Sequence, residues 1–92
     1  MAKSIMQTEK ECYITHSPLN LHKHHILFGP FRSKSEHYGL WVYLRYDWHI
    51  QTPYAVHNDR ELDLMLKREA QKRFECLYGH ELWMQEFKRN YL

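Results

Sequence analysis

Three histidines stand within four positions of the segment LHKHHILFGPF: His22, His24 and His25. Imidazole is the commonest side-chain ligand of metal ions in proteins, and it also accepts protons near neutral pH. Two adjacent histidines can divide this work, because one can bind a metal ion while the other takes a proton from water. Further along the chain, His49 and His57 could supply more ligands to the same ion. The pattern indicates a candidate metal site with a candidate general base.

The spacing of these histidines leaves two interpretations open. In a regular strand, successive side chains point to opposite faces, so His24 and His25 converge on one site only if the strand bends or ends there. His22 and His24 would share a face, and either could be an ordinary surface residue. From the residues alone, a working metal site and a chance cluster in a chain with eight histidines both remain open.

The composition is typical of a small globular domain. The 92 residues fit one domain, and 43% hydrophobic residues are enough for a core and too many for a disordered chain. A domain of this size has marginal stability unless a disulfide, a metal ion or a partner subunit adds to it. The formal net charge of +2 permits a nucleic-acid partner without requiring one.

Cysteine usage and hydropathy indicate a reducing compartment. The two cysteines, Cys12 and Cys76, cannot make a disulfide framework, and we expect both thiols to be free. The polar start MAKSIMQTEKE lacks the apolar region of a signal peptide. No apolar run approaches the roughly 20 residues that span a bilayer. We therefore expect a cytoplasmic protein with no membrane partner.

Hydrophobic patterning predicts an α+β domain over residues 12–92, preceded by a flexible N-terminal segment over 1–11. The long helix should begin with Asn58 as its N-cap and Glu61 at the third helical position, and Gly79 should end it. The predicted elements are strands over 24–28 and 40–46, a polar loop over 32–39, an irregular stretch over 47–57, and helices over 58–79 and 80–92. The residues predicted to pack from the two helices are Leu62, Leu66, Ala70, Phe74, Leu77, Leu82, Trp83 and Phe87.

Basic residues near the two strands are candidate contacts to nucleic acid. Arg32 and Lys34 follow the histidine-rich strand, and Arg45 lies near the end of the second strand. Phosphate contacts dominate the affinity of proteins for DNA, and these cations could supply them. The basic residues of the long helix, Lys67 among them, are interpreted as part of a solvated face.

Several pieces of the chain occur in an order that resembles the small HNH-type nucleases of phages and prophages. These pieces are LHKHHI, RSKSEHYG, AVH, ELD and the final RNYL, and the resemblance extends from about residue 12 to the last residue. It implies a ββα-metal fold, in which a long hairpin precedes a long helix and a short C-terminal helix. It also implies an endonuclease that hydrolyses DNA in a bacterial host cell with the help of one divalent ion.

The same resemblance implies separate roles for the histidines. His24 and His49 take the positions of metal ligands, and His57 that of a further ligand or phosphate contact. His25 takes the position of the general base that activates water. The candidate ions are Mg²⁺, Mn²⁺, Ni²⁺ and Zn²⁺, and imidazole ligands favour the transition metals over Mg²⁺.

The sequence departs from this family at its structural zinc site. Four cysteines would hold that ion, but the corresponding positions here are Cys12, Thr15, Arg45 and Trp48. One cysteine cannot hold a tetrahedral zinc ion, so we predict that the structural zinc is absent and that aromatic side chains pack in its place. A homodimer, formed through the aromatic surplus, would be one way to recover stability.

Two other functions remain open at this point. The chain could be a catalytically inactive, nuclease-derived module that binds DNA or a protein, and its binding would then be insensitive to a chelator. Alternatively, the histidines could hold zinc for stability alone, and a chelator would then lower the melting temperature sharply.

Overall fold

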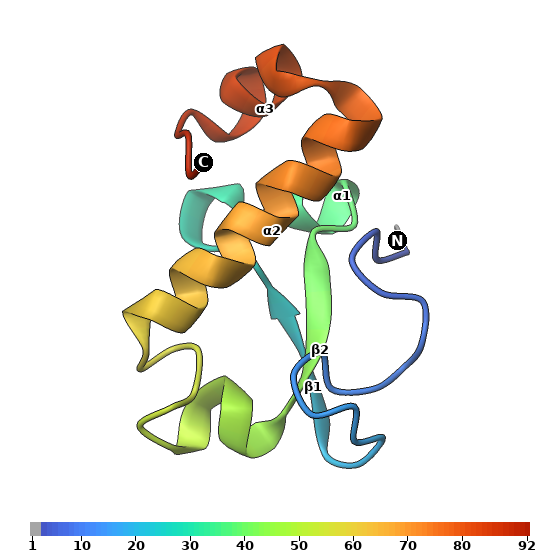
Figure 1. The fold of residues 1–92 in the computed structure, drawn as a ribbon, viewed down its shortest axis with the longest axis vertical. Coiled ribbons are helices and arrows are strands. Elements are labelled where there is room, and N and C mark those ends of the chain that lie inside the picture. The colour runs from blue at the N-terminus through green and yellow to red at the C-terminus, as the bar shows by residue number, and fades with distance from the viewer. Residues whose placement is uncertain (1–2) are drawn as a thin grey trace.

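The computed structural model describes residues 3–92, except for the side chain of Gln51. It is an α+β fold, as predicted, with one antiparallel two-stranded sheet and helices around it (Figure 1). Residues 1 and 2 of the N-terminal segment lie outside the described residues. The elements are β1 (Leu21–His25), a 3₁₀ turn η1 (Gly29–Phe31), α1 (Arg32–His37), β2 (Trp41–Arg45), a π-helical turn η2 (Asp47–Gln51), α2 (Arg60–Tyr78) and α3 (His80–Phe87).

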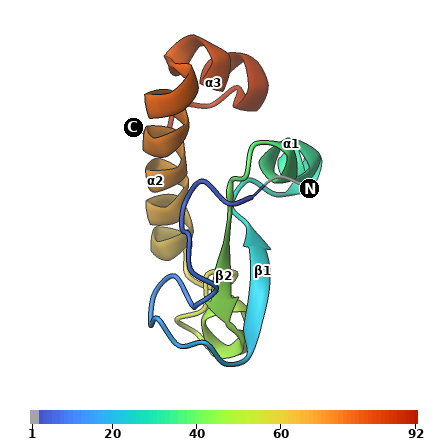
Figure 2. The same ribbon diagram turned by 90° about the vertical axis from the view of Figure 1, so that its right-hand side faces the viewer.

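The register of the hairpin decides which histidines face the core. His22 pairs with Leu44 and His24 pairs with Val42, and both partner side chains are fully buried. Side chains of directly paired residues project to the same face of a sheet. His22 and His24 therefore lie on the face that α2 covers (Figure 2), and His25 projects to the opposite face.

The connection between the strands contains a helix where the sequence predicts a polar loop. After β1 ends at His25, Gly29 and Pro30 begin the turn η1, and α1 follows it directly. The buried hydroxyl of Ser35 donates to Leu40 O at 2.5 Å and accepts from Leu27 N at 3.3 Å. This helix is held by tertiary hydrogen bonds of a buried side chain, and intrinsic helix propensity does not capture such bonds. The prediction of a loop over 32–39 is therefore wrong.

The predicted strand bounds also differ from the observed ones. The first strand is predicted over 24–28 and is found at Leu21–His25, while the second shrinks from 40–46 to Trp41–Arg45. Ile26 and Leu27 remain buried beyond the end of β1. The shift matters because it places all three histidines of the opening motif inside one regular strand.

The long helix is capped by Asp59 and not by the predicted Asn58. Asp59 Oδ1 accepts hydrogen bonds from the backbone of Glu61 at 3.0 Å and of Leu62 at 3.3 Å. Asn58 instead donates to carbonyl oxygens of the preceding loop. Gly79 ends the helix as predicted, and its N–H donates to the carbonyl of Glu75 at 2.9 Å.

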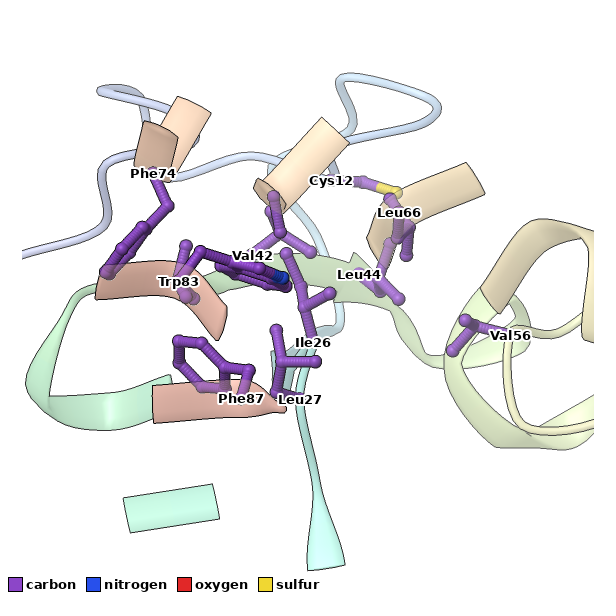
Figure 3. Packing of buried hydrophobic residues seen from close by; sticks show 12 residues of the cluster. Cys12, Ile26, Leu27, Val42, Leu44, Val56, Leu66, Phe74, Trp83 and Phe87 are labelled. Atoms are coloured by element: carbon purple, nitrogen blue, oxygen red, sulfur yellow. The ribbon is translucent and has the colours of Figure 1, made fainter. Parts of the chain in front are cut away.

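The core joins α2, α3 and the inner face of the hairpin (Figure 3). Leu66, Ala70, Phe74, Trp83 and Phe87 are buried as predicted, and the partly buried Leu62 and Leu82 pack against them. Leu77 is 48% exposed, so its assignment to the core stripe is wrong. No helix within the described residues is long and apolar enough to cross a membrane.

The last helix is shorter than predicted because the chain reverses after Phe87. Lys88 adopts a left-handed backbone conformation with φ of 63°. The remaining residues fold back on α2, where the fully buried Gln71 accepts from Tyr91 N at 2.7 Å and donates to Asn90 at 2.8 Å. The final RNYL segment is therefore held to the middle of the long helix.

Residues 4–7 lie along the outer edge of β2. Ile5 N donates to Gly39 O at 2.9 Å, Ser4 Oγ donates to Trp41 O at 2.6 Å, and Gln7 Oε1 accepts from Tyr43 N at 2.7 Å. These bonds satisfy backbone groups that the two-stranded sheet leaves unpaired. Flexibility over 1–11 stays a prediction, but the described part of that segment is bonded to the sheet.

Two glycines allow a matched test of how closely the N-terminal segment packs. Gly29 and Gly39 both have positive φ, of 64° and 72°. A Cβ on Gly39 would lie 2.1 Å from Lys3 O, whereas a Cβ on Gly29 would meet nothing within 4 Å.

Both alanine variants should lose about 1–2 kcal/mol from backbone strain, and Gly39→Ala should lose at least a further ~1 kcal/mol because the segment must move. Urea unfolding of Gly29→Ala and Gly39→Ala measures the difference. Equal losses in the two variants would contradict the close packing of this segment on the hairpin.

Candidate metal centre

Four histidines gather at the end of the hairpin nearest η2. His22 and His24 come from the core-facing side of β1, His49 from the η2 turn, and His57 from the loop that leads into α2. Backbone bonds hold that loop to the turn, with Val56 N donating to the carbonyl of Trp48 at 2.7 Å. Elements far apart in the sequence thus bring four imidazole rings into contact.

Three of these rings have the spacing of a metal site. The ligand nitrogens of His24, His49 and His57 all lie within 4.8 Å of one another, and they form a group that could hold a metal ion. The Nε2 atoms of His49 and His57 are 3.0 Å apart. Two nitrogens bound to one tetrahedral ion at about 2.0–2.1 Å would be separated by about 3.3 Å. The separation of His49 and His57 is therefore close to that of two ligands of one ion, and His24, whose ligand atom lies within 4.8 Å of theirs, could complete the set by rotation of the rings.

Burial keeps two of these imidazoles neutral. Burial lowers the pKa of His24 to about 3, and the neighbouring rings of His49 and His57 add to the effect. Burial also lowers the pKa of His49 to about 4, with smaller contributions from His57 and His22. Neutral imidazole is the form that binds metal ions, so the site is ready for a cation at pH 7.

His24 has a polar atom that the protein leaves unsatisfied. The residue is 2% exposed, and its Nε2 has no hydrogen-bond partner among the described residues. Most buried polar side-chain atoms are hydrogen-bonded, and an exception indicates a functional group, a water or an ion. A cation held together with His49 and His57 would satisfy this atom.

Lys67 and Phe28 border the histidine cluster. The Lys67 ammonium lies 4.2 Å from the centre of the Phe28 ring and is 2.8 Å from Asp63 Oδ2. The Phe28 ring centre is 6.0 Å from that of His57 and 6.4 Å from that of His24. The positive charge of Lys67 also contributes to the lowered pKa of His24. Lys67 is 12% exposed in its side chain, so its place beside the histidines differs from the solvated face predicted for it.

His25 lies outside the cluster, as strand alternation requires. Its Nε2 donates to Glu36 Oε1 at 2.9 Å, and Lys23 Nζ donates to the same oxygen at 2.7 Å. Hydrogen bonds from Lys23 and His25 hold the pKa of Glu36 below its ordinary value. The structure therefore gives the predicted general base a carboxylate partner on the opposite face from His24.

The three predicted phosphate contacts have different surroundings. Arg45 forms a bidentate ion pair with Asp47 at 2.7 and 2.9 Å. Lys34 lies 3.1 Å from a carboxylate oxygen of Glu86. Arg32 is exposed and lines a surface hollow with His25. Of the three cations, Arg32 is therefore the one placed next to a predicted catalytic residue.

The positions that the HNH resemblance aligns with zinc ligands make other interactions in this chain. Cys12 is fully buried, and Cys12 and Cys76 are both free thiols. Burial would raise the pKa of the Cys12 thiol, but hydrogen bonds from the Thr15 side chain and nearby backbone groups lower it below its ordinary value. The Trp48 ring packs on Tyr54, with ring centres 4.6 Å apart. The absence of structural zinc stays a prediction.

The sequence predicts no role for three residues of this region. His22 belongs to the histidine motif but has no predicted part in the site. Lys67 comes from a segment predicted to be a solvated face, and Glu36 from one predicted to be a loop. The HxH spacing of residues 22 and 24 was the available signal for His22, because it predicts a shared strand face. Nothing in the sequence indicates that α1 brings Glu36 to His25 or that α2 brings Lys67 close to His24.

Comparisons with known proteins found no match. No family model, no curated protein and no solved structure matches this chain. The resemblance to HNH-type nucleases therefore stays a prediction.

The lowered pKa of His24 predicts the pH dependence of folding for the metal-free protein. Unfolded His24 takes up a proton near its ordinary pKa of 6.5, whereas folded His24 takes it up only near about 3. Between these values the unfolded state binds more protons, so stability falls as the pH falls. The loss is up to about 1.4 kcal/mol per pH unit for this residue.

Chemical unfolding at pH 7, 6, 5 and 4 with a chelator present measures this slope. The His24→Leu variant should show a shallower slope, and His37→Gln, which changes an exposed histidine, should keep the slope of the unmodified protein. A His24→Leu slope equal to that of the unmodified protein would contradict the buried neutral imidazole.

Proposed function

We propose that this protein is a divalent-metal-dependent endonuclease of the HNH type that hydrolyses DNA phosphodiester bonds. The observation that carries the proposal is the convergence of His24, His49 and His57, which include an unsatisfied buried nitrogen. These are the three residues that the resemblance implies as ligands. The arrangement of the β1–β2 hairpin against α2, with the histidines at one end, supports assignment to a ββα-metal fold.

The number of ligands favours a catalytic over a purely structural site. Structural zinc sites are closed by four protein ligands, whereas catalytic sites keep three and leave a position for water or substrate. The three histidines range from the buried His24 to the exposed His57. One side of the site is thus enclosed by the core and the other is accessible to a phosphate group.

Residues of the chain supply binding, charge and proton transfer around this site. An ion bound there would act as a Lewis acid on a phosphoryl oxygen and would make water a stronger nucleophile. Lys67, now paired with Asp63, lies beside His24 and would stabilise a phosphate group if it exchanged that carboxylate for the phosphate. The exposed ring of Phe28, which borders His57, offers an apolar surface to a sugar or base.

The resemblance makes His25 the candidate general base, but its ring projects to the face of β1 opposite His24, so this role requires the end of β1 to turn His25 toward the metal site when DNA binds. The bond to Glu36 places the ring proton of neutral His25 on Nε2, so Nδ1 is left as the nitrogen that accepts a proton. Arg32 shares a surface hollow with His25 and could hold a neighbouring phosphate. This role is supported by the resemblance alone, because the Glu36 partner and the hollow lie on the opposite face of β1 from His24.

A second candidate function is a metal site that serves stability alone. The burial of His24 favours it, because an ion on a core residue would contribute its binding free energy to folding. The two candidates differ in what happens to DNA, since a stability site would bind the ion without cleaving a phosphodiester bond.

A plasmid-nicking assay with Mg²⁺, Mn²⁺, Ni²⁺ or Zn²⁺ tests the nuclease. We expect metal-dependent nicking that EDTA abolishes. His57→Ala should reduce it by at least about 10–100-fold, since losing a ligand should cost no less than losing a residue that positions one, and the exposed site keeps the core unchanged. His37→Ala, an exposed histidine outside the cluster, is the matched control and should nick as the unmodified protein does. Folded, metal-bound protein that cleaves nothing with any of these ions would move the assignment to the stability site.

His25→Ala tests the general base separately from the metal site. The variant should lose about 10²–10⁴-fold in nicking rate, the usual contribution of general-base catalysis, while Zn²⁺ affinity measured by calorimetry stays unchanged. Unchanged nicking would show that another group takes the proton.

A further inference from the structure

We propose that His22 is a positioning residue for the metal site: it accepts a hydrogen bond from His49 Nδ1 and so fixes His49 to bind the ion through Nε2. This inference rests on the metal site of the proposed function, but it concerns how the chain prepares one ligand. It gives the first histidine of the LHKHH motif a role distinct from those of His24 and His25.

The contacts of His49 define which nitrogen faces the ion. Its Nε2 lies 3.0 Å from Nε2 of His57, another member of the candidate metal group, and its Nδ1 lies 3.1 Å from Nδ1 of His22, which is not a member. A neutral imidazole has one ring proton, and a nitrogen that binds a metal ion cannot hold it. When Nε2 binds the ion, the proton must therefore be on Nδ1, where it points to His22.

The same reasoning fixes the protonation pattern of His22. Its Nδ1 must present a lone pair to the His49 N–H, so the ring proton of neutral His22 lies on Nε2. In metal-binding histidines, the N–H of the second ring nitrogen usually donates a hydrogen bond to a carboxylate or a carbonyl, and this bond orients the ring. Here an imidazole occupies the position of that acceptor.

His22 is placed to orient His49 and is not itself part of the ligand group. The mutually close ligand atoms belong to His24, His49 and His57, and His22 contacts the opposite edge of the His49 ring. The Tyr46 ring, whose centre lies 5.1 Å from that of His22 in an edge-on arrangement, packs against it. The half-buried His22 is thus held between Tyr46 and His49.

Strand geometry explains why the acceptor comes from position 22. His22 and His24 point to the same face of β1, two residues apart, so one can reach the ion and the other the back of His49. Lys23, between them, points to the other face and pairs with Glu36. The HxH spacing therefore delivers one ligand and one positioning residue.

Two variants of similar size separate a hydrogen-bonding role from a packing role. His22→Asn can place Oδ1 where His22 Nδ1 now lies, because both atoms are attached to Cγ, and it keeps an acceptor for His49. His22→Leu fills similar space without an acceptor. Calorimetry with Zn²⁺ should show affinity about 10–100-fold weaker for His22→Leu and close to that of the unmodified protein for His22→Asn.

The absorption spectrum of the Co²⁺-loaded variants distinguishes positioning from ligation. At saturating Co²⁺, the visible bands of both variants should match those of the unmodified protein, because the three ligands are unchanged. Altered bands in both variants would show that His22 is a ligand, and equal Zn²⁺ affinity for His22→Leu and the unmodified protein would show that it has no role. Either result overturns the inference.

Nitrogen-15 NMR of the unmodified, Zn²⁺-loaded protein gives a test that does not depend on any variant folding. We expect the proton of His49 on Nδ1 and that of His22 on Nε2, and the opposite assignment for either ring would overturn the inference. If the unmodified protein binds neither Zn²⁺ nor Co²⁺, the metal site of the proposed function fails, and the inference fails with it. If binding and ring assignments are as expected but plasmid is not nicked, the nuclease assignment alone fails.

Discussion

The burial of one imidazole, that of His24, is the constraint on which the rest of the site depends. The hairpin register pairs His24 with Val42, and Val42 is part of the core, so the imidazole must enter the core as well. A buried polar group without a partner costs about 1–3 kcal/mol, and Nε2 of His24 has no partner within the described chain. A small domain has little stability to spare, so the location favours a cation that this nitrogen can bind.

The other elements of the site can be understood from this position. The η2 turn and the following loop bring His49 and His57 to the accessible side of His24, and α2 places Lys67 beside it. Because the ligands come from three segments, an ion would join the hairpin to the approach of the long helix. Metal binding and folding should therefore be linked, since an ion that binds only the folded state stabilises it.

The part of the fold that the sequence predicts best is the part that local rules govern. The hydrophobic period predicts α2, and Gly79 predicts its end. Both signals are local, because each depends on residues that lie only a few positions apart in the sequence. The neighbouring residues Asn58 and Asp59 are both good caps, and only the loop bonds of Asn58 decide between them. The polar segment of α1 carries no hydrophobic period. The sequence also does not predict the buried hydroxyl of Ser35, which bonds Leu27, beyond the end of β1, and Leu40, just before β2.

The candidate site divides in the same way. Alternation along a strand was enough to predict that His22 and His24 share a face and that His24 and His25 diverge unless the strand bends. It could not predict that the strand begins at Leu21 and remains regular through His25. Nor could it predict that Glu36 accepts a hydrogen bond from His25 on the opposite face of the strand. The residue types make His24, His49 and His57 candidate ligands of one ion, and the resemblance assigns them positions around it. Spacing alone does not show that residues from a strand, a turn and a loop come together.

The most direct test of the metal centre is X-ray absorption spectroscopy on the protein loaded with Zn²⁺, with the stoichiometry measured by native mass spectrometry. The account predicts one ion per chain, bound by three imidazole nitrogens at about 2.0–2.1 Å with one further light-atom ligand from solvent. Failure to bind Zn²⁺ would contradict it. So would a sulfur ligand at about 2.3 Å, because that distance would place the ion at a cysteine and away from the histidine cluster.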